Sequence, residues 1–122
     1  MIGYVTIGTN DIERAARFYD ELLKEVGAGR FMSTESLIAW SSSPAAPALA
    51  VTKPFDGNAA TVGNGVMVAL QMDSAASVDA FHKRAMELGA SDEGEPGPRG
   101  DNFYAGYFRD LDGNKLAAFK MG

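Results

Sequence analysis

An internal repeat is the feature of this sequence that most limits its possible folds. Two stretches of similar pattern follow one another, and Phe18 and Phe81 occupy matching places 63 positions apart. Each stretch has the pattern of a strand, a helix and three further strands. Because a chain of 122 residues is about the size of one domain, we predict a single domain. We expect its two modules at about residues 1–55 and 64–122.

The first copy opens with β-forming residues over positions 2–8, which predict a strand. Apolar residues then recur at steps of three and four and predict a helix: Ile12, Ala15, Ala16, Tyr19, Leu22, Leu23 and Val26. Asn10 is the expected N-cap, Glu13 its capping-box partner and Gly27 the left-handed C-cap. Three short strands are expected at residues 30–34, 37–42 and 48–52, and a connector at 53–64.

The second copy repeats this order. A strand is expected over residues 65–72, followed by a helix capped by Asp73 or Ser74. The apolar stripe of that helix is Val78, Phe81, Ala85 and Leu88, with Gly89 at its C-terminal end. Residues 91–93 read as a weak strand start, and residues 95–100 as a stiff loop because Pro96 and Pro98 fall within it. Two strands at 103–109 and 115–121 then flank a turn, because Gly113 favours positive φ.

The closing segment, YAGYFRDLDGNKLAAF over residues 104–119, resembles the last hairpin of the vicinal oxygen chelate superfamily. That superfamily contains glyoxalases, bleomycin resistance proteins and extradiol dioxygenases. Its hairpin usually carries D-P-D-G-N and then a metal-binding Glu, whereas this chain has Leu111 for the Pro and Ala117 for the Glu. The resemblance covers nearly the whole chain. It implies an α+β fold of two βαβββ modules that form a curled eight-stranded mixed sheet with helices outside.

The resemblance also implies where metal ligands would lie, namely on the first and last strands of each module. Tyr4 and Met67 occupy the two first-strand positions, and Ala117 occupies the Glu position. The fourth ligand would fall in residues 48–52, and no His, Asp, Glu or Cys occurs between Ser36 and Phe55. Hard or borderline divalent metals need carboxylate or imidazole ligands. We therefore expect no metal and no other cofactor.

Aromatic and soft side chains are the alternative lining for a cleft without metal. Tyr4, Met67 and Ala117 are expected to converge there, although each aromatic candidate is equally compatible with a place in the core. Further candidates for ligand contact are Trp40, Tyr104, Tyr107 and Arg99. Hairpin register decides whether Tyr104 or Tyr107 faces the cleft. Arg99 is positioned either to meet an anionic ligand group or to lie on the surface.

Three other patterns favour structural roles. His82 is the only histidine and lies at the edge of a helical apolar stripe, as a partly buried core histidine would. Asp110, Asp112 and Asn114 resemble the start of a calcium loop, but no Glu follows at the twelfth position, which favours a turn. The glycines at 94, 97 and 100 alternate with prolines, which lack the N–H groups that a phosphate site needs.

Composition excludes several classes of function. The net charge of −5 and the lack of a Lys/Arg cluster argue against nucleic-acid binding. Cysteine is absent, which excludes disulfides and thiolate chemistry. No membrane-spanning apolar run and no signal sequence is present, so a cytoplasmic location is the expectation.

Together these observations predict a metal-independent protein that binds or sequesters a small molecule, for example an aromatic or cationic one, and forms a homodimer. One alternative is a lyase or dioxygenase-type enzyme with an atypical site, which either takes metal through other residues or uses Tyr4 as a general acid. The other is a structural or regulatory module without catalysis, whose cleft is filled by its own side chains. An open cleft between the modules favours a binder and a filled one favours the module.

Overall fold

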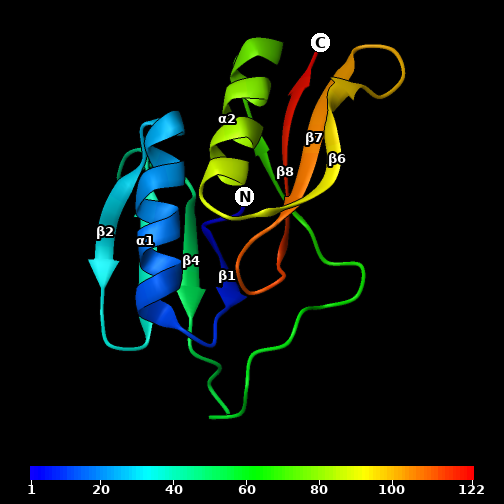
Figure 1. Cartoon of the computed structure of the whole chain (residues 1–122). Helices are drawn as coiled ribbons and strands as arrows, with labels where there is room; N and C mark the ends of the chain where they lie inside the picture. The colour runs from blue at the N-terminus through cyan, green and yellow to red at the C-terminus, as the bar shows by residue number, and fades with distance from the viewer. The chain divides into compact units, whose positions relative to one another are not determined.

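The computed structural model describes all 122 residues and divides them into two compact units, Met1–Val62 and Gly63–Gly122. Residues 53–62 of the connector therefore belong to the first unit. Each unit contains one four-stranded mixed sheet and one main helix. The predicted α+β class and the repeated βαβββ order are confirmed, and the eight strands form two sheets of four (Figure 1).

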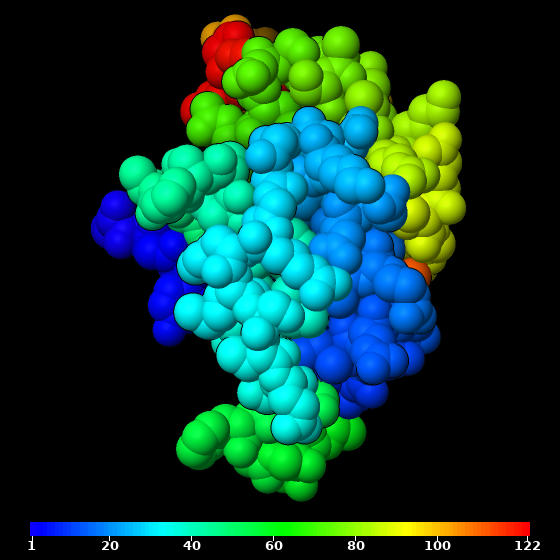
Figure 2. Space-filling model, turned by 90° about the vertical axis from the view of Figure 1, so that its left-hand side faces the viewer, coloured from blue at the N-terminus to red at the C-terminus, as the bar shows by residue number.

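The first unit has the strand order β1-β4-β3-β2, in which β1 runs parallel to β4 and the other pairs are antiparallel. Helix α1 packs on one face of this sheet (Figure 1). Figure 2 shows α1 and β2 side by side, with the N-terminal segment on the side away from α1. The elements are β1 (Tyr4–Gly8), α1 (Ile12–Leu22), the 3-10 turn η1 (Leu23–Val26), β2 (Gly29–Ser33), β3 (Leu37–Ser41) and β4 (Ala48–Thr52).

The second unit repeats this topology with the order β5-β8-β7-β6, and β5 runs parallel to β8. Helix α2 packs against β6, β7 and β8 (Figure 1). The elements are β5 (Val68–Gln71), α2 (Ala75–Glu87), β6 (Ser91–Pro98), β7 (Phe103–Arg109) and β8 (Lys115–Met121). No helix of the chain is long and apolar enough to cross a membrane.

The core of each unit lies between its helix and its sheet. In the first, the ring centroids of Tyr19 on α1 and Trp40 on β3 are 5.7 Å apart. In the second, the centroids of Phe81 on α2 and Phe108 on β7 are 6.1 Å apart. All four side chains are almost fully buried, and contacts of this kind supply most of the hydrophobic stabilisation of a small unit.

Helix ends follow the sequence with one correction. Asp11, and not Asn10, caps α1, because its carboxylate accepts from the Arg14 N–H. Asn10 instead exchanges two hydrogen bonds with the backbone of Ala60. Ser74 caps α2 and accepts from the Ser77 N–H, as one of the two predicted residues. Gly27 has the predicted left-handed conformation, with φ of 71°.

The prediction of a stiff loop over residues 95–100 is wrong for residues 95–98. Strand β6 continues through Pro98, with register shifts between Asp92 and Gly94 and between Gly94 and Gly97. It is the edge strand of its sheet, and an edge position tolerates Pro96 and Pro98 because one side of the strand has no partner to bond.

Candidate functional site

Register assigns each residue of the second sheet to one of its two faces. Phe108 contacts Phe81 of α2 and is paired with Leu116, so these side chains lie on the helix side. Tyr107 is paired with Ala117, and Ala117 with Ala69, so these three lie on the opposite face. We call this face, which α2 does not cover, the helix-free face of the second sheet. On β5, β7 and β8 its residues are Ala69, Gln71, Phe103, Ala105, Tyr107, Arg109, Lys115, Ala117, Phe119 and Met121.

The register also separates the two tyrosines that the sequence left undecided. Tyr107 lies on the helix-free face. Tyr104 lies on the helix side, where its hydroxyl donates to the Asp79 carboxylate of α2 over 2.6 Å. This hydrogen bond to Asp79 is the main cause that raises the pKa of Tyr104 above its ordinary value. Tyr104 thus fastens the first turns of α2 to β7.

Two cations lie close to the ring of Tyr107. The guanidinium carbon of Arg99 and the Nζ atom of Lys115 are each 5.5 Å from the ring centroid. Neither cation has a carboxylate partner in the chain, whereas the neighbouring Arg109 pairs with Glu93 at 3.0 Å. Neither the Lys115 ammonium nor the Tyr107 hydroxyl forms a hydrogen bond to any group of the chain. Because no buried side-chain N or O atom lacks a partner, both groups reach the surface.

The Arg99 side chain is held by the backbone of β6. Its Nη1 donates to the carbonyl oxygens of Gly97 and Pro98, and its Nη2 donates to that of Glu95. A Cβ atom added at Gly94 would lie 3.3 Å from Nη2 of Arg99 and 3.0 Å from the Tyr107 ring, and one at Gly97 would lie 3.2 Å from Nη1. The glycines therefore make room for the guanidinium. The spacing of glycines in the sequence was visible, but this role for them was not predicted.

In the first unit, strand register places Tyr4 and Trp40 on opposite faces of the sheet. The Trp40 indole lies on the helix side, where its Nε1–H donates to Asp20 of α1 over 2.8 Å. Tyr4 lies on the other face, since Val5 pairs with Leu49 and Leu49 pairs with Trp40. Tyr4 is 67% exposed, whereas Trp40 is 1% exposed. Trp40 is thus part of the core, and Tyr4 is accessible to a ligand.

The remaining predicted site residues belong to the second unit. Met67 directly precedes β5 and is 42% exposed, and Ala117 in the middle of β8 is 1% exposed. Ala117 therefore does not line open space within the chain. Tyr4 lies in the other unit, and its convergence with Met67 and Ala117 stays a prediction.

Tyr4, Met67 and Ala117 are the side chains at the ligand positions that the resemblance implies. No group of three His, Cys, Asp or Glu side chains lies close enough together to hold a metal ion. Ala117 carries no donor atom. A phenol such as that of Tyr4 is a weak ligand unless it is ionised, and the Met67 thioether suits copper(I) better than magnesium, manganese or zinc.

His82 has the structural role that its position in the sequence indicates. It is 4% exposed, and its Nε2 lies 3.0 Å from the Asp92 carboxylate and 3.2 Å from the Tyr107 carbonyl oxygen. Because both partners only accept, Nε2 carries the proton and donates. The Gly94 N–H and then the His82 contact lower the pKa of Asp92 below its ordinary value. The imidazole thus joins α2 to β6 and β7.

The segment 110–114 forms a turn, as predicted. The Asp110 carboxylate accepts from the backbone N–H groups of Asp112 and Asn114 and from the Asn114 side-chain amide. These bonds direct its oxygens to the turn's own donors and not to a cation.

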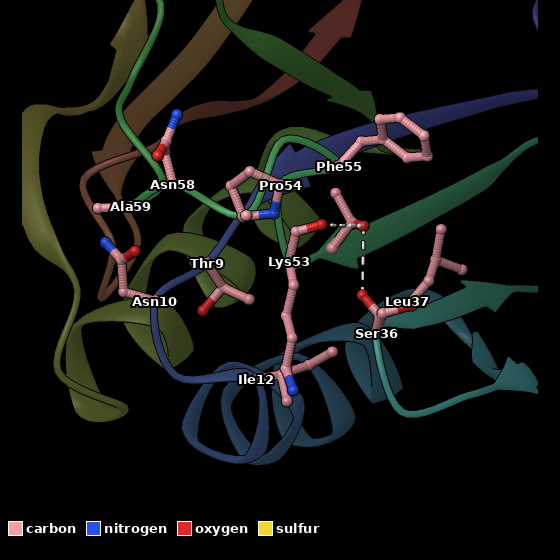
Figure 3. A pocket seen from close by; sticks show the side chains of 12 residues that line it. Thr9, Asn10, Ile12, Ser36, Leu37, Lys53, Pro54, Phe55, Asn58 and Ala59 are labelled. Carbon is pink, nitrogen blue, oxygen red and sulfur yellow. Dashed lines mark hydrogen bonds between the residues drawn. The ribbon is translucent and has the colours of Figure 1, made fainter.

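A hollow of about 740 Å³ lies at one end of the first unit, where the connector folds back against the β1–α1 turn (Figure 3). Thr52 Oγ1 donates to the carbonyl oxygens of Ser36 and Lys53 at its wall (Figure 3). None of the predicted site residues lines this hollow, which was not foreseen from the sequence. Its lining is Thr9, Asn10, Ile12, Ser36, Leu37, Thr52, Lys53, Pro54, Phe55, Gly57, Asn58 and Ala59.

Comparisons with known proteins agree with the fold. The family model described as Glyoxalase/Bleomycin resistance protein/Dioxygenase superfamily matches residues 1–118. A glyoxalase/bleomycin resistance protein from Albidiferax ferrireducens T118 is 36% identical, with a TM-score of 0.91 over 100% of this chain and 99% of that one. No curated protein matches the chain.

Two more distant solved structures show the same fold. A glyoxalase-related enzyme from Fulvimarina pelagi is 20% identical, with a TM-score of 0.78 over 98% of this chain and 87% of that chain. A lactoylglutathione lyase from Agrobacterium tumefaciens is 18% identical, with a TM-score of 0.72 over 98% of this chain and 92% of that chain. At such identities the likeness concerns the fold alone.

Proposed function

The chain belongs to the Glyoxalase/Bleomycin resistance protein/Dioxygenase superfamily, and from that premise we propose that it binds or sequesters a small organic molecule without a metal ion. The observation that carries this proposal is the chemistry at the expected ligand positions. Tyr4, Met67 and Ala117 stand there, and no three His, Cys, Asp or Glu side chains lie close enough together elsewhere in the chain to hold a metal ion.

Exposure supports a role in binding for two of these residues. Tyr4 and Met67 are large and apolar, yet they are 67% and 42% exposed. The Tyr4 phenol can both donate and accept a hydrogen bond, and the Met67 thioether adapts to ligands of different shape. Such side chains suit a mostly apolar ligand with one polar group.

Native mass spectrometry of the purified protein, together with elemental analysis, tests this proposal. We expect no stoichiometric manganese, iron, nickel, zinc or magnesium. A bound organic molecule should survive gentle desolvation, and Tyr4→Phe should weaken its binding by about 0.5–1.5 kcal/mol, the contribution of one hydrogen bond. A metal content near one ion per chain, or turnover of a glutathione adduct or an aromatic diol, would favour the enzyme alternative.

We also propose that two copies associate. Strand β2 is an edge strand, and Phe31 and Met32 on it are 59% and 48% exposed. An apolar, unpaired sheet edge is a liability that association removes. Light scattering at tens of micromolar protein should give the mass of a dimer, and Phe31→Ser should shift it toward monomer. A monomer mass for the wild-type protein would exclude this assembly.

A further inference from the structure

We propose that Arg99, Tyr107 and Lys115 form a recognition site for the negatively charged group of a small organic anion, such as an aromatic carboxylate or sulfonate. This inference rests on the proposed function, because it names the class of ligand that the protein would bind. It differs from the expectation of a cationic ligand, which stays a prediction.

Two positive charges at this site have no acidic partner. On the helix-free face of the second sheet, Arg109 is neutralised by Glu93 and also donates to the Gly113 carbonyl oxygen. Arg99 and Lys115 have no carboxylate partner, although the chain as a whole carries a net charge of −5. Two unpaired cations beside one aromatic ring give a local positive potential in an otherwise acidic protein.

The three side chains also keep hydrogen-bond donors that no group of the chain accepts. A guanidinium has five N–H groups, and Arg99 uses three of them on backbone carbonyl oxygens, so two remain. Lys115 keeps all three ammonium protons, and Tyr107 keeps its hydroxyl proton. An anionic oxygen accepts charge-assisted hydrogen bonds from such donors, which are stronger than bonds between neutral groups.

Arg99 is held in place before a ligand arrives. Three hydrogen bonds to β6 and the Tyr107 ring fix its guanidinium, and Gly94 and Gly97 leave the room for it. A side chain that is already fixed loses little rotamer entropy when an anion binds. Tyr107 is partly exposed, and its ring provides an apolar contact for the body of the ligand.

A pair of fluorescent probes with the same rings tests the inference. The probe 1-anilinonaphthalene-8-sulfonate carries a negative charge, and N-phenyl-1-naphthylamine does not. We expect the wild-type protein to bind the sulfonate probe at least about fivefold more tightly than the neutral probe, and added NaCl to reduce this preference. The full-length chain is used throughout, and circular dichroism confirms that each variant is folded.

Lys115→Met should remove most of the preference for the anionic probe over the neutral probe. Arg99→Gln should have the same effect. The matched control is Lys120→Met, which deletes the same charge from the same strand but on the helix side, opposite Tyr104. This control should keep the preference of the wild type.

The outcomes distinguish failure of the anion inference from failure of the proposed function. If both probes bind equally and Lys115→Met changes nothing, the anion inference is wrong and the proposed function stands. If Lys115→Met and Lys120→Met have equal effects, only the net charge matters and the assigned site is wrong. If neither probe binds, the proposed function fails, and the inference fails with it.

Discussion

Asp20 offers the sharpest test of the packing between α1 and the first sheet. Its carboxylate accepts from the Trp40 Nε1–H at 2.8 Å and forms two hydrogen bonds with the Arg30 guanidinium, at 2.8 and 2.7 Å. The two partners differ in burial, since Trp40 is 1% exposed and the Arg30 side chain is 39% exposed. Removing Asp20 therefore leaves one buried donor without its partner and one exposed cation unpaired.

The expected loss follows from these two parts. A buried donor left without its acceptor costs about 1–3 kcal/mol, and an exposed ion pair contributes about 0.2–1 kcal/mol. The Asp20 side chain is itself 33% exposed, so water replaces part of the lost bond. We expect Asp20→Ala to reduce the free energy of unfolding by about 2 kcal/mol and Arg30→Ala by about 0.5 kcal/mol.

The assay is urea denaturation followed by the fluorescence of Trp40, the only tryptophan, which reports on the first unit. Asp20→Asn is the matched variant, because its amide oxygen still accepts from the indole while the ion pair is lost. It should resemble Arg30→Ala. The reasoning is refuted if Arg30→Ala costs as much as Asp20→Ala, because the buried bond to Trp40 would then contribute nothing.

Three further predictions concern pH, His82 and the connector. The Arg30 hydrogen bonds lower the pKa of Asp20, so the stability advantage of the wild type over Asp20→Asn should be complete above about pH 4 and vanish as the pH falls through the lowered pKa in acid denaturation curves. His82→Ala should cost about 2–4 kcal/mol in chemical denaturation, because it opens a cavity and removes the donor to Tyr107; Asp92→Asn, which keeps that donor, should cost less than half as much. Gly8→Ala should loosen residues 53–60, since the new Cβ would lie 3.0 Å from the Cβ of Ala60. Limited proteolysis should therefore cut this segment faster in Gly8→Ala, and also in Asn10→Ala. Unchanged cleavage in both variants would contradict the contact between the connector and the β1–α1 turn.

The sequence determined the closing hairpin well, for local reasons. The strands at 103–109 and 115–121 were predicted with the observed bounds, because the DLDGN turn marks both ends by short-range hydrogen bonding. The cap of α1 was misplaced by one residue, since Asn10 and Asp11 are both good caps and only the contact with Ala60 separates them. Strand β6 was partly missed because its prolines break a strand pattern unless the strand lies at an edge.

The candidate site was less predictable, because it depends on contacts between segments. The register of β7 against β8 decides that Tyr107 and not Tyr104 lies on the helix-free face, and a shift of one residue would exchange them. The placement of Arg99 depends on how its side chain folds back over β6. Periodicity does not encode either contact. Because Ala117 is 1% exposed, Ala117→Leu should cost about 1–3 kcal/mol of stability by overpacking.

The central claim is that this member of the superfamily binds its ligand without metal, and titration of the protein with N-phenyl-1-naphthylamine in the presence and absence of a chelator tests it most directly. The account predicts the same dissociation constant with excess EDTA, with no addition, and with manganese, nickel or zinc added after removal of the chelator. Binding that disappears with EDTA and returns with one of these ions would contradict it, since metal affinity requires ligands that Tyr4, Met67 and Ala117 do not provide.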